Sequence, residues 1–115
     1  MIDLSNVKGI HLYSGHTDLR KSSHSLLVII QDKYNIEEIR NHIFLFCNRR
    51  KDRLKIVEVD YDGIWLYSKQ LIDSKYSWPK VEKGVMTLSE EHLLYLLKGL
   101  DITKIHQEVK LQYTY

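Results

Sequence analysis

The spacing of hydrophobic residues changes twice along the first part of the chain. Ile10-His11-Leu12-Tyr13 alternates apolar and polar side chains, which predicts a short strand that Gly15 ends. Thr17 or Asp18 can then cap a helix, because a short polar side chain there accepts a hydrogen bond from a backbone N–H. The apolar face of this helix is formed by Leu19, Ser23, Leu26, Leu27, Ile30 and Tyr34.

The run from Leu26 to Ile30 fits two structures. Its β-branched residues also suit a buried strand. We favour a helix because the run continues through Gln31-Asp32-Lys33 without a turn signal before Asn35.

The middle of the chain has the pattern of consecutive antiparallel strands. Residues 43–47 are apolar throughout, which predicts a strand buried on both faces. A polar loop over 48–53 leads to a second strand at 54–59. The turn Asp60-Tyr61-Asp62-Gly63 leads to a third at 64–71. Tyr76-Ser77-Trp78 is a candidate edge strand, where Pro79 is tolerated.

The last clear element is a leucine-rich helix. Thr87 or Ser89 can cap it, Glu90 and Glu91 suit its first turn, and Lys98-Gly99 suits its end. In the tail, apolar residues occupy odd positions from Ile105 to Tyr115, which predicts a strand. Such a strand could lie against a second subunit and form a homodimer.

These elements predict an α+β fold. We expect an antiparallel β-meander of four to five strands with two main helices packed on one face. At 115 residues, the chain is expected to form a single domain over 1–115, with a C-terminal tail at 102–115.

Composition supports a globular, cytoplasmic protein. Hydrophobic residues make up 43% of the chain and charged residues 28%, which are ordinary values. The single cysteine, Cys47, fits a reducing compartment. No apolar run reaches the roughly 18 residues of a membrane span, so no membrane association is expected.

Charge distribution is more informative than the net charge of +2. The segment 48–55 holds five cations and one acid: Arg49, Arg50, Lys51, Arg53 and Lys55, with Asp52. Arg20 and Lys21 form a second basic group. Such a loop between rigid strands can bind a polyanion. The alternative is a solvated hairpin tip that keeps the sheet soluble.

The aromatic residues and Asp18 also allow two interpretations. Trp65, Tyr67 and Trp78 could stack on bases, but sheet aromatics are more often core residues, which we favour for Trp65. Asp18 could pair with Arg20 or reach the loop at Asn48, although a helix cap with surface charges is the simpler interpretation.

Enzyme signatures are weak. Glu58, Asp60 and Asp62 resemble a metal cluster, but acids are common in turns. Asp101 with Glu108-x-Lys110 resembles the acids and lysine of metal-dependent nucleases, and a three-residue match arises readily by chance. Cys47 lies in an apolar run, no close histidine pair occurs, and no glycine-rich phosphate loop is present. We therefore expect no catalytic residues, metal or cofactor.

Several motifs occur together, in order, between residues 10 and 101. The first is Gly15-x-Thr17-Asp18-x-Arg20-Lys21. The second is Asn48-Arg49-Arg50-x-Asp52-Arg53-x-Lys55. A strand with Asp62, Gly63, Trp65, Leu66, Tyr67 and Lys69 follows, then Trp78-Pro79 and a segment with Leu93, Leu97, Gly99, Leu100 and Asp101.

In these motifs the chain resembles the second-open-reading-frame proteins of the IS sixty-six group of bacterial insertion sequences. The resemblance implies a non-catalytic accessory protein required for transposition, encoded beside a transposase. We expect the basic hairpin to bind the transposase of the same element, element-end DNA, or both. A protein-only adaptor and a small metal-dependent nuclease are the alternatives.

The resemblance and the charge pattern together predict the site residues. Binding of nucleic acid or a partner is expected at Arg49, Arg50, Lys51, Arg53, Lys55, Arg20, Lys21 and Lys69. Structural support of this site is expected from Thr17, Asp18, Asn48, Asp52, Asp62, Gly63 and Trp65.

Overall fold

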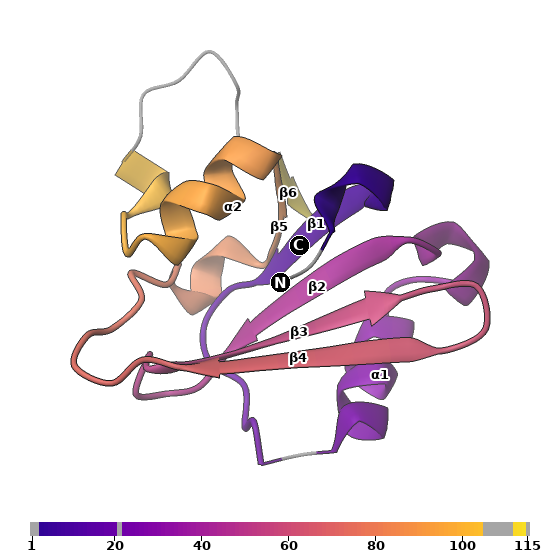
Figure 1. Ribbon diagram of the computed structural model, residues 1–115, viewed down its shortest axis with the longest axis horizontal. Helices are drawn as coiled ribbons and strands as arrows, with labels where there is room; N and C mark the ends of the chain where they lie inside the picture. Colours follow the sequence, from indigo (N-terminus) through magenta and orange to yellow (C-terminus); the bar gives the residue numbers. More distant parts are fainter. Residues whose placement is uncertain (1–2, 21, 105–111, 115) are drawn as a thin grey trace.

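The structure is a computed structural model that describes residues 3–20, 22–104 and 112–114. Within these residues, six strands form one sheet in the order β4-β3-β2-β1-β5-β6 (Figure 1). The strands are β1 Gly9–Tyr13, β2 His42–Cys47, β3 Arg53–Val59, β4 Ile64–Gln70, β5 Val85–Leu88 and β6 Gln112–Thr114. The helices are α1 Ser23–Gln31 and α2 Glu90–Leu97. Four 3-10 turns complete the described elements: η1 Leu4–Asn6, η2 Ile36–Ile39, η3 Val81–Lys83 and η4 Ile102–Lys104.

The α+β class is confirmed, and so is the antiparallel meander of β2, β3 and β4. The sheet is nevertheless mixed, because β1 pairs with β2 in parallel. Parallel neighbours need a crossover connection, and α1 lies in the segment that joins these two strands. Helix α1 contains the Leu26–Ile30 run, so the prediction of a helix there is confirmed.

The two helices lie on opposite faces of the sheet, so the prediction that both pack on one face is wrong. Leu26 and Ile30 of α1 belong to one core cluster with Phe44 and Phe46, while Leu93 and Leu96 of α2 belong to the other. The physical reason is the sequence of β2. Successive side chains of this strand point to opposite faces and are apolar on both, so each face must be covered by a packed layer.

The predicted edge strand at 76–78 is also wrong. This segment has no strand pairing, yet Tyr76 and Trp78 are buried, and the Trp78 indole N–H donates to the Tyr13 carbonyl at 2.9 Å. The strand beside β1 is instead β5. Thr87 lies within β5, so of the two predicted caps for α2 only Ser89 acts as one.

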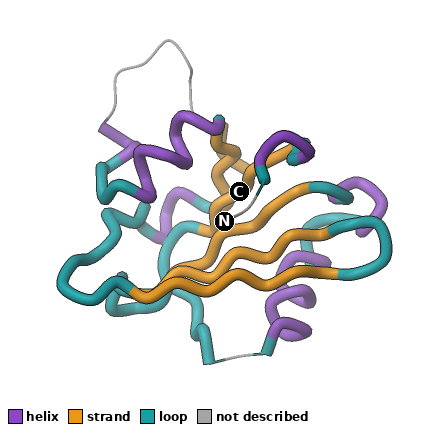
Figure 2. The backbone as a smooth tube through the Cα atoms, in the orientation of Figure 1, coloured by secondary structure: helices purple, strands orange, loops and turns teal. Residues whose placement is uncertain are grey.

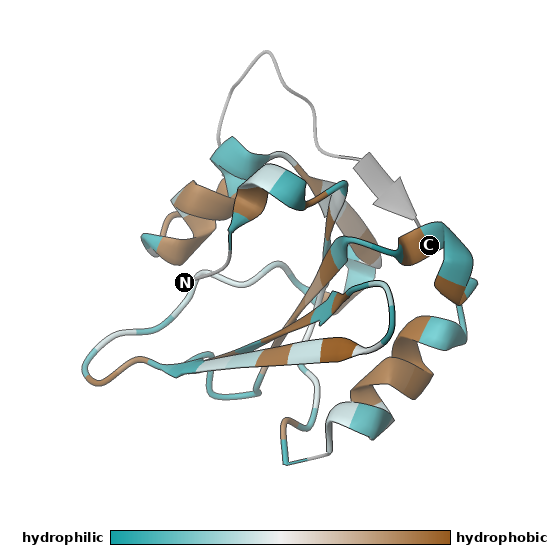
Figure 3. Cartoon of the chain, turned by 45° about the vertical axis from the view of Figure 1, so that its right-hand side comes forward, coloured by the Kyte–Doolittle hydropathy of each residue, from teal (hydrophilic) through white to brown (hydrophobic). Residues whose placement is uncertain are grey.

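Each of the two helices begins directly after a serine whose side chain caps it. Helix α1 begins after Ser22, whose hydroxyl accepts a hydrogen bond from the Ser25 N–H, rather than after Thr17 or Asp18. Asp18 instead binds the backbone and side chain of Arg20. Figure 3 shows hydrophobic and hydrophilic residues side by side along both helices, as expected for helices that cover a sheet.

Part of the predicted tail strand is described. Strand β6 pairs with β5 of the same chain, whereas Ile105 to Leu111 and Tyr115 lie outside the described residues. A homodimer through the tail remains a prediction. No helix in the described residues has the length and apolar character needed to cross a membrane.

Candidate nucleic-acid interface

Asn48 organises the loop between β2 and β3. Its side-chain oxygen accepts hydrogen bonds from the backbone N–H groups of Asp52 and Arg53, at 3.1 and 3.0 Å. Its side-chain nitrogen donates to the Asp52 carboxylate at 2.7 Å. The loop is therefore closed by one amide that satisfies two backbone donors, and its outward-facing cations sit on a fixed backbone.

The same loop is held from outside by the segment that follows β4. The Leu71 N–H donates to the Asp52 carbonyl and the Tyr76 N–H to the Lys51 carbonyl, each at 2.7 Å. Lys51 has a φ of 63°, a left-handed conformation that costs a side-chain-bearing residue energy. These contacts keep that conformation in place. Figure 2 shows the segment after β4 at the same end of the sheet as this loop.

A second loop, residues 14–20, lies beside the hairpin. The Thr17 N–H donates to the Cys47 carbonyl at 2.8 Å, so this loop is attached where β2 ends. Together the two loops enclose a hollow of about 370 Å³. We call it the basic site. The first loop contributes His16, Thr17, Asp18, Leu19 and Arg20, and the hairpin contributes Asn48, Arg49, Arg50 and Arg53. The fold thus joins two basic groups that are far apart in the sequence.

Three of the four guanidinium groups have internal partners of unequal strength. Arg20 binds the Asp18 carboxylate through two nitrogen atoms at 3.0 Å, and this hydrogen bond raises the pKa of Arg20. Arg53 donates to the Gln70 side chain at 2.8 Å. Arg50 lies 4.0 Å from Asp52 and its side chain is 83% exposed, so that pair is weak.

Arg49 and Arg50 are the cations most open to a ligand. Both are exposed, and Arg49 also lines a smaller hollow of about 80 Å³ with Lys51 and Lys80. The Asp52 carboxylate turns inward: the hydrogen bond from Asn48 lowers its pKa, and so, to a smaller extent, does the charge of Arg50. The surface between the two hollows is therefore dominated by positive charge.

The sequence did not single out His16 and Lys80. His16 stands inside the Gly15–Thr17 motif, and Lys80 directly follows Trp78-Pro79. The motifs beside these two residues are visible in the sequence. Their position at the basic site depends on the hydrogen bonds that attach residues 14–17 and 79 to the end of the hairpin. The Gly15 N–H donates to the Pro79 carbonyl at 2.8 Å.

Several predicted site residues are elsewhere. The Lys55 ammonium donates to the Leu19 carbonyl at 2.6 Å and so connects β3 to the second loop. Lys69 lines a separate apolar groove. Asp62, Gly63 and Trp65 lie at the opposite end of the β3–β4 pair from the hairpin loop (Figure 1). Lys21 lies outside the described residues.

Two predicted aromatic roles are resolved by burial. Trp65 is 60% exposed and its indole N–H binds the Asp60 carboxylate at 2.8 Å, so it is not the core residue that we favoured. Trp78 is buried and unavailable for stacking on bases.

Asp101 and Cys47 were weighed as candidate catalytic residues. In the structure Asp101 is hydrogen-bonded to its neighbour Thr103 and Cys47 is buried. The Asp101 carboxylate accepts hydrogen bonds from the N–H and hydroxyl of Thr103, and Glu108 and Lys110 lie outside the described residues. Cys47 is buried, which raises the pKa of its thiol to about 12 and keeps it protonated. The described part of the chain contains no group of three His, Cys, Asp or Glu residues that could hold a metal ion.

Comparison with known proteins agrees with the motifs. The chain matches the family described as IS66 Orf2 like protein over residues 8–107. Uncharacterized protein y4hO of Sinorhizobium fredii is 32% identical over 92 residues, which cover 80% of each chain. Uncharacterized protein y4jC of the same bacterium is 29% identical over 91 residues, covering 79% of this chain and 78% of that protein. No solved structure matches. The family match includes both loops of the basic site.

Proposed function

Because this chain belongs to the IS66 Orf2-like family of insertion-sequence proteins, we propose that it is a non-catalytic accessory protein for transposition that binds element-end DNA through the basic site. The observation that carries the proposal is the convergence of Arg20, Arg49, Arg50 and Arg53 around one hollow. A guanidinium group can donate two parallel hydrogen bonds to a phosphate, so such a cluster suits a sugar-phosphate backbone.

The geometry supports phosphate contact more than reading of bases. The exposed cations Arg49 and Arg50 lie on a short loop next to the hollow, and no residue of a described helix lines it. Affinity should therefore depend strongly on salt and weakly on sequence. The protein would then contribute DNA contacts to the transposase complex, and recognition of the element ends would come from elsewhere.

The proposal is tested by changing Arg49 and Arg50 together to Gln. Both side chains are exposed, so folding should be unchanged. In gel shifts over a salt series, the slope of log affinity against log salt should fall by about two units, one for each lost phosphate contact. A matched control changes Lys8 and Lys33 to Gln, which removes the same charge from exposed side chains that line neither the basic site nor the smaller hollow.

The result that would overturn the proposal is equally definite. If the folded Arg49→Gln/Arg50→Gln protein supports transposition at the wild-type frequency, the basic site does not serve the function. If it binds DNA with unchanged affinity and salt slope, the DNA contact lies elsewhere.

A further inference from the structure

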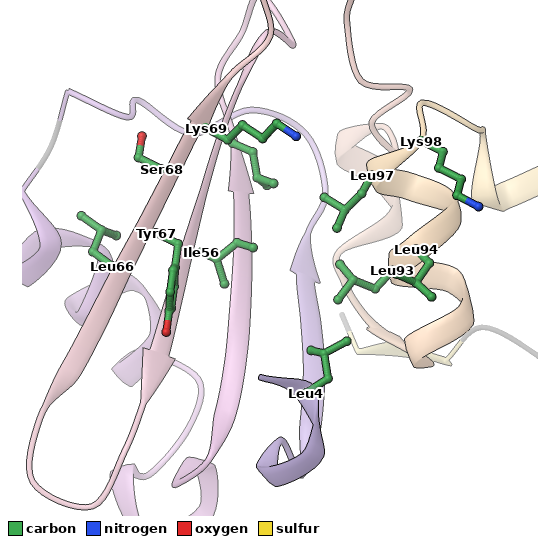
Figure 4. A pocket seen from close by; sticks show the side chains of 11 residues that line it. Leu4, Ile56, Leu66, Tyr67, Ser68, Lys69, Leu93, Leu94, Leu97 and Lys98 are labelled. Atoms are coloured by element: carbon green, nitrogen blue, oxygen red, sulfur yellow. The ribbon is translucent and has the colours of Figure 1, made fainter. Parts of the chain in front are cut away.

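A second surface, formed by the described residues, is lined mainly by apolar side chains. On the α2 side of the sheet, a groove of about 690 Å³ runs between α2 and the outer strands (Figure 4). We call it the α2–β4 groove. Its floor includes Leu54 and Ile56 of β3 and Tyr67 of β4, and its wall includes Leu93, Leu94 and Leu97 of α2.

The groove exists because one helix covers only part of a wide sheet. The core on this side joins α2 to β1, β2 and β5, and it also includes Leu54 and Ile56 of β3, which are 3% and 7% exposed. The side of this face toward β4 is less covered, since Tyr67 of β4 is half-buried and Leu94 of α2 is 43% exposed. The sheet therefore has room for a second helix beside α2, in the same layer.

The two charged residues that line the groove are lysines, and both lie at one end of it. Lys69 on β4 and Lys98 at the end of α2 face the groove from opposite sides, and Leu4 lies toward the other end (Figure 4). No acidic residue is among the described lining residues, although the Tyr67 hydroxyl on the floor donates to the Glu58 carboxylate at 2.7 Å. A ligand that fills it should therefore be apolar along its length and negatively charged where the two lysines meet it.

The backbone of β4 distinguishes a helical ligand from an added strand. Hydrogen bonds from Leu71 N–H to Asp52 C=O and from Asp60 N–H to Gly63 C=O mark the two ends of the β3–β4 pairing. Alternation between them leaves the backbone groups of Ile64, Leu66, Ser68 and Gln70 facing away from β3.

A strand added to that outer edge would lie beyond β4, on the side away from α2. It would leave Leu93, Leu94 and Leu97 uncovered. A helix that lies on the sheet face contacts the floor and the α2 wall together, so the shape of the groove favours a helix.

We propose that the α2–β4 groove binds an amphipathic helix of a partner protein, with apolar residues at helical spacing on the groove floor and acidic residues beside Lys69 and Lys98. The identity of the partner as the transposase of the same element rests on the proposed function. The two surfaces are then separate: the basic site contacts DNA and the groove contacts protein.

The experiment measures binding of overlapping fluorescent peptides that span the transposase encoded beside this protein, by fluorescence polarisation with the full chain. The peptide that binds best should have apolar residues at positions i, i+3, i+4 and i+7 and acidic residues at one end. Leu94→Asp should weaken its binding at least about tenfold, because an exposed apolar contact becomes a buried charge.

Matched variants separate the groove from general effects. Val28→Asp introduces the same charge at a similarly exposed residue of α1 on the other face and should leave binding unchanged. Lys69→Glu with Lys98→Glu should weaken binding by about tenfold or more. A peptide whose acids are changed to lysine should then bind the reversed protein better than the native one.

Each alternative result overturns the inference. The proposal fails if no transposase peptide binds, if the best peptide is basic or has strand-like alternation, or if the groove variants bind as well as the native protein. It also fails if sedimentation shows that the groove variants disrupt a dimer of this chain instead. Arg49→Gln/Arg50→Gln should bind the peptide normally, so loss of DNA binding and loss of peptide binding are independent outcomes.

Discussion

At the scale of single residues, Asn48 has the largest influence on the basic site. One side chain satisfies the backbone donors of Asp52 and Arg53 and fixes the Asp52 carboxylate. The charged residues around it are interchangeable in part, because exposed guanidinium groups contribute little to stability. Asn48 has no such freedom, since its oxygen and nitrogen are both used.

We predict that Asn48→Ala destabilises the protein by about 1–3 kcal/mol, because two backbone donors lose their acceptor. Urea denaturation of the variant measures this. Arg49→Ala serves as the control and should change the unfolding free energy by less than about 0.5 kcal/mol. An effect of Asn48→Ala as small as that of the control would contradict this account of the loop.

His11 is a second residue with a specific consequence. It is buried against Phe44 and contacts His42 through a ring-nitrogen pair at 2.8 Å. Burial, and secondly the neighbouring His42, lowers the pKa of His11 from 6.5 to about 4. Below pH 6.5 the unfolded chain therefore binds a proton at this residue that the folded protein does not bind until about pH 4.

Stability should consequently fall as the pH drops from about 6.5 to 4, with His11 contributing roughly 1–3 kcal/mol to the loss. His11→Phe should reduce the slope, because the ring remains but the titrating group is gone. Chemical denaturation at several pH values compares the two proteins, and equal slopes would exclude this role for His11. Burial, and secondly the charge of Lys8, also lowers the pKa of His42, which adds its own contribution in the native protein.

At the scale of elements, the two helices begin with serine caps that have different surroundings. Ser22 accepts a hydrogen bond from the Ser25 N–H at the exposed start of α1. Ser89 accepts one from the His92 N–H and also pairs with the His92 ring nitrogen at 2.9 Å. His92 is only 2% exposed, so its ring nitrogen has little access to water.

Ser89→Ala should therefore cost more than Ser22→Ala. We expect about 1 kcal/mol for loss of the cap at Ser22 and about 2 kcal/mol or more at Ser89, where a buried ring also loses its partner. Thermal or urea unfolding of the two variants gives the comparison, with Ser23→Ala as a control inside α1. Equal costs would mean that His92 finds another partner.

At the scale of the whole molecule, protection from solvent is graded across the sheet. Strand β2 has neighbours on both sides and a helix over each face, whereas β4 has one neighbour and an outer edge. The basic site lies where β2 ends, and the α2–β4 groove lies over the outer strands. The most covered strand, β2, therefore supports the basic site, and the least covered strand of the β2–β4 meander, β4, borders the groove.

Hydrogen exchange followed residue by residue should show this gradient. The β2 amides should exchange on the order of a hundredfold more slowly than those of Ile64, Leu66, Ser68 and Gln70, which face away from β3. Binding of a helix in the groove should leave these four amides fast, while an added strand would slow them. Uniform protection across the sheet would contradict the described edge.

The sequence predicted the elements far better than their arrangement. The continuous run at 43–47, the hairpin around Asn48 and the turn at Asp60–Gly63 each carry a local signal, and each element is present. Strand β5 was missed because four residues beside a cap signal give little periodicity. Trp78 was placed in a strand because aromatic residues favour strands. In the structure it lies in a loop, where its ring is buried and its indole N–H donates to the Tyr13 carbonyl.

The chain by itself determined where strands, turns and cations lie, because turn chemistry, periodicity and charge are properties of neighbouring residues. Only the tertiary structure decided that β1 and β2 run parallel, that the helices cover opposite faces, and that Arg20 meets Arg49 and Arg50 around one hollow. These features depend on contacts between segments about thirty residues apart, such as the bond from Thr17 to Cys47. No local pattern encodes them, since they follow from how the whole chain buries both faces of β2.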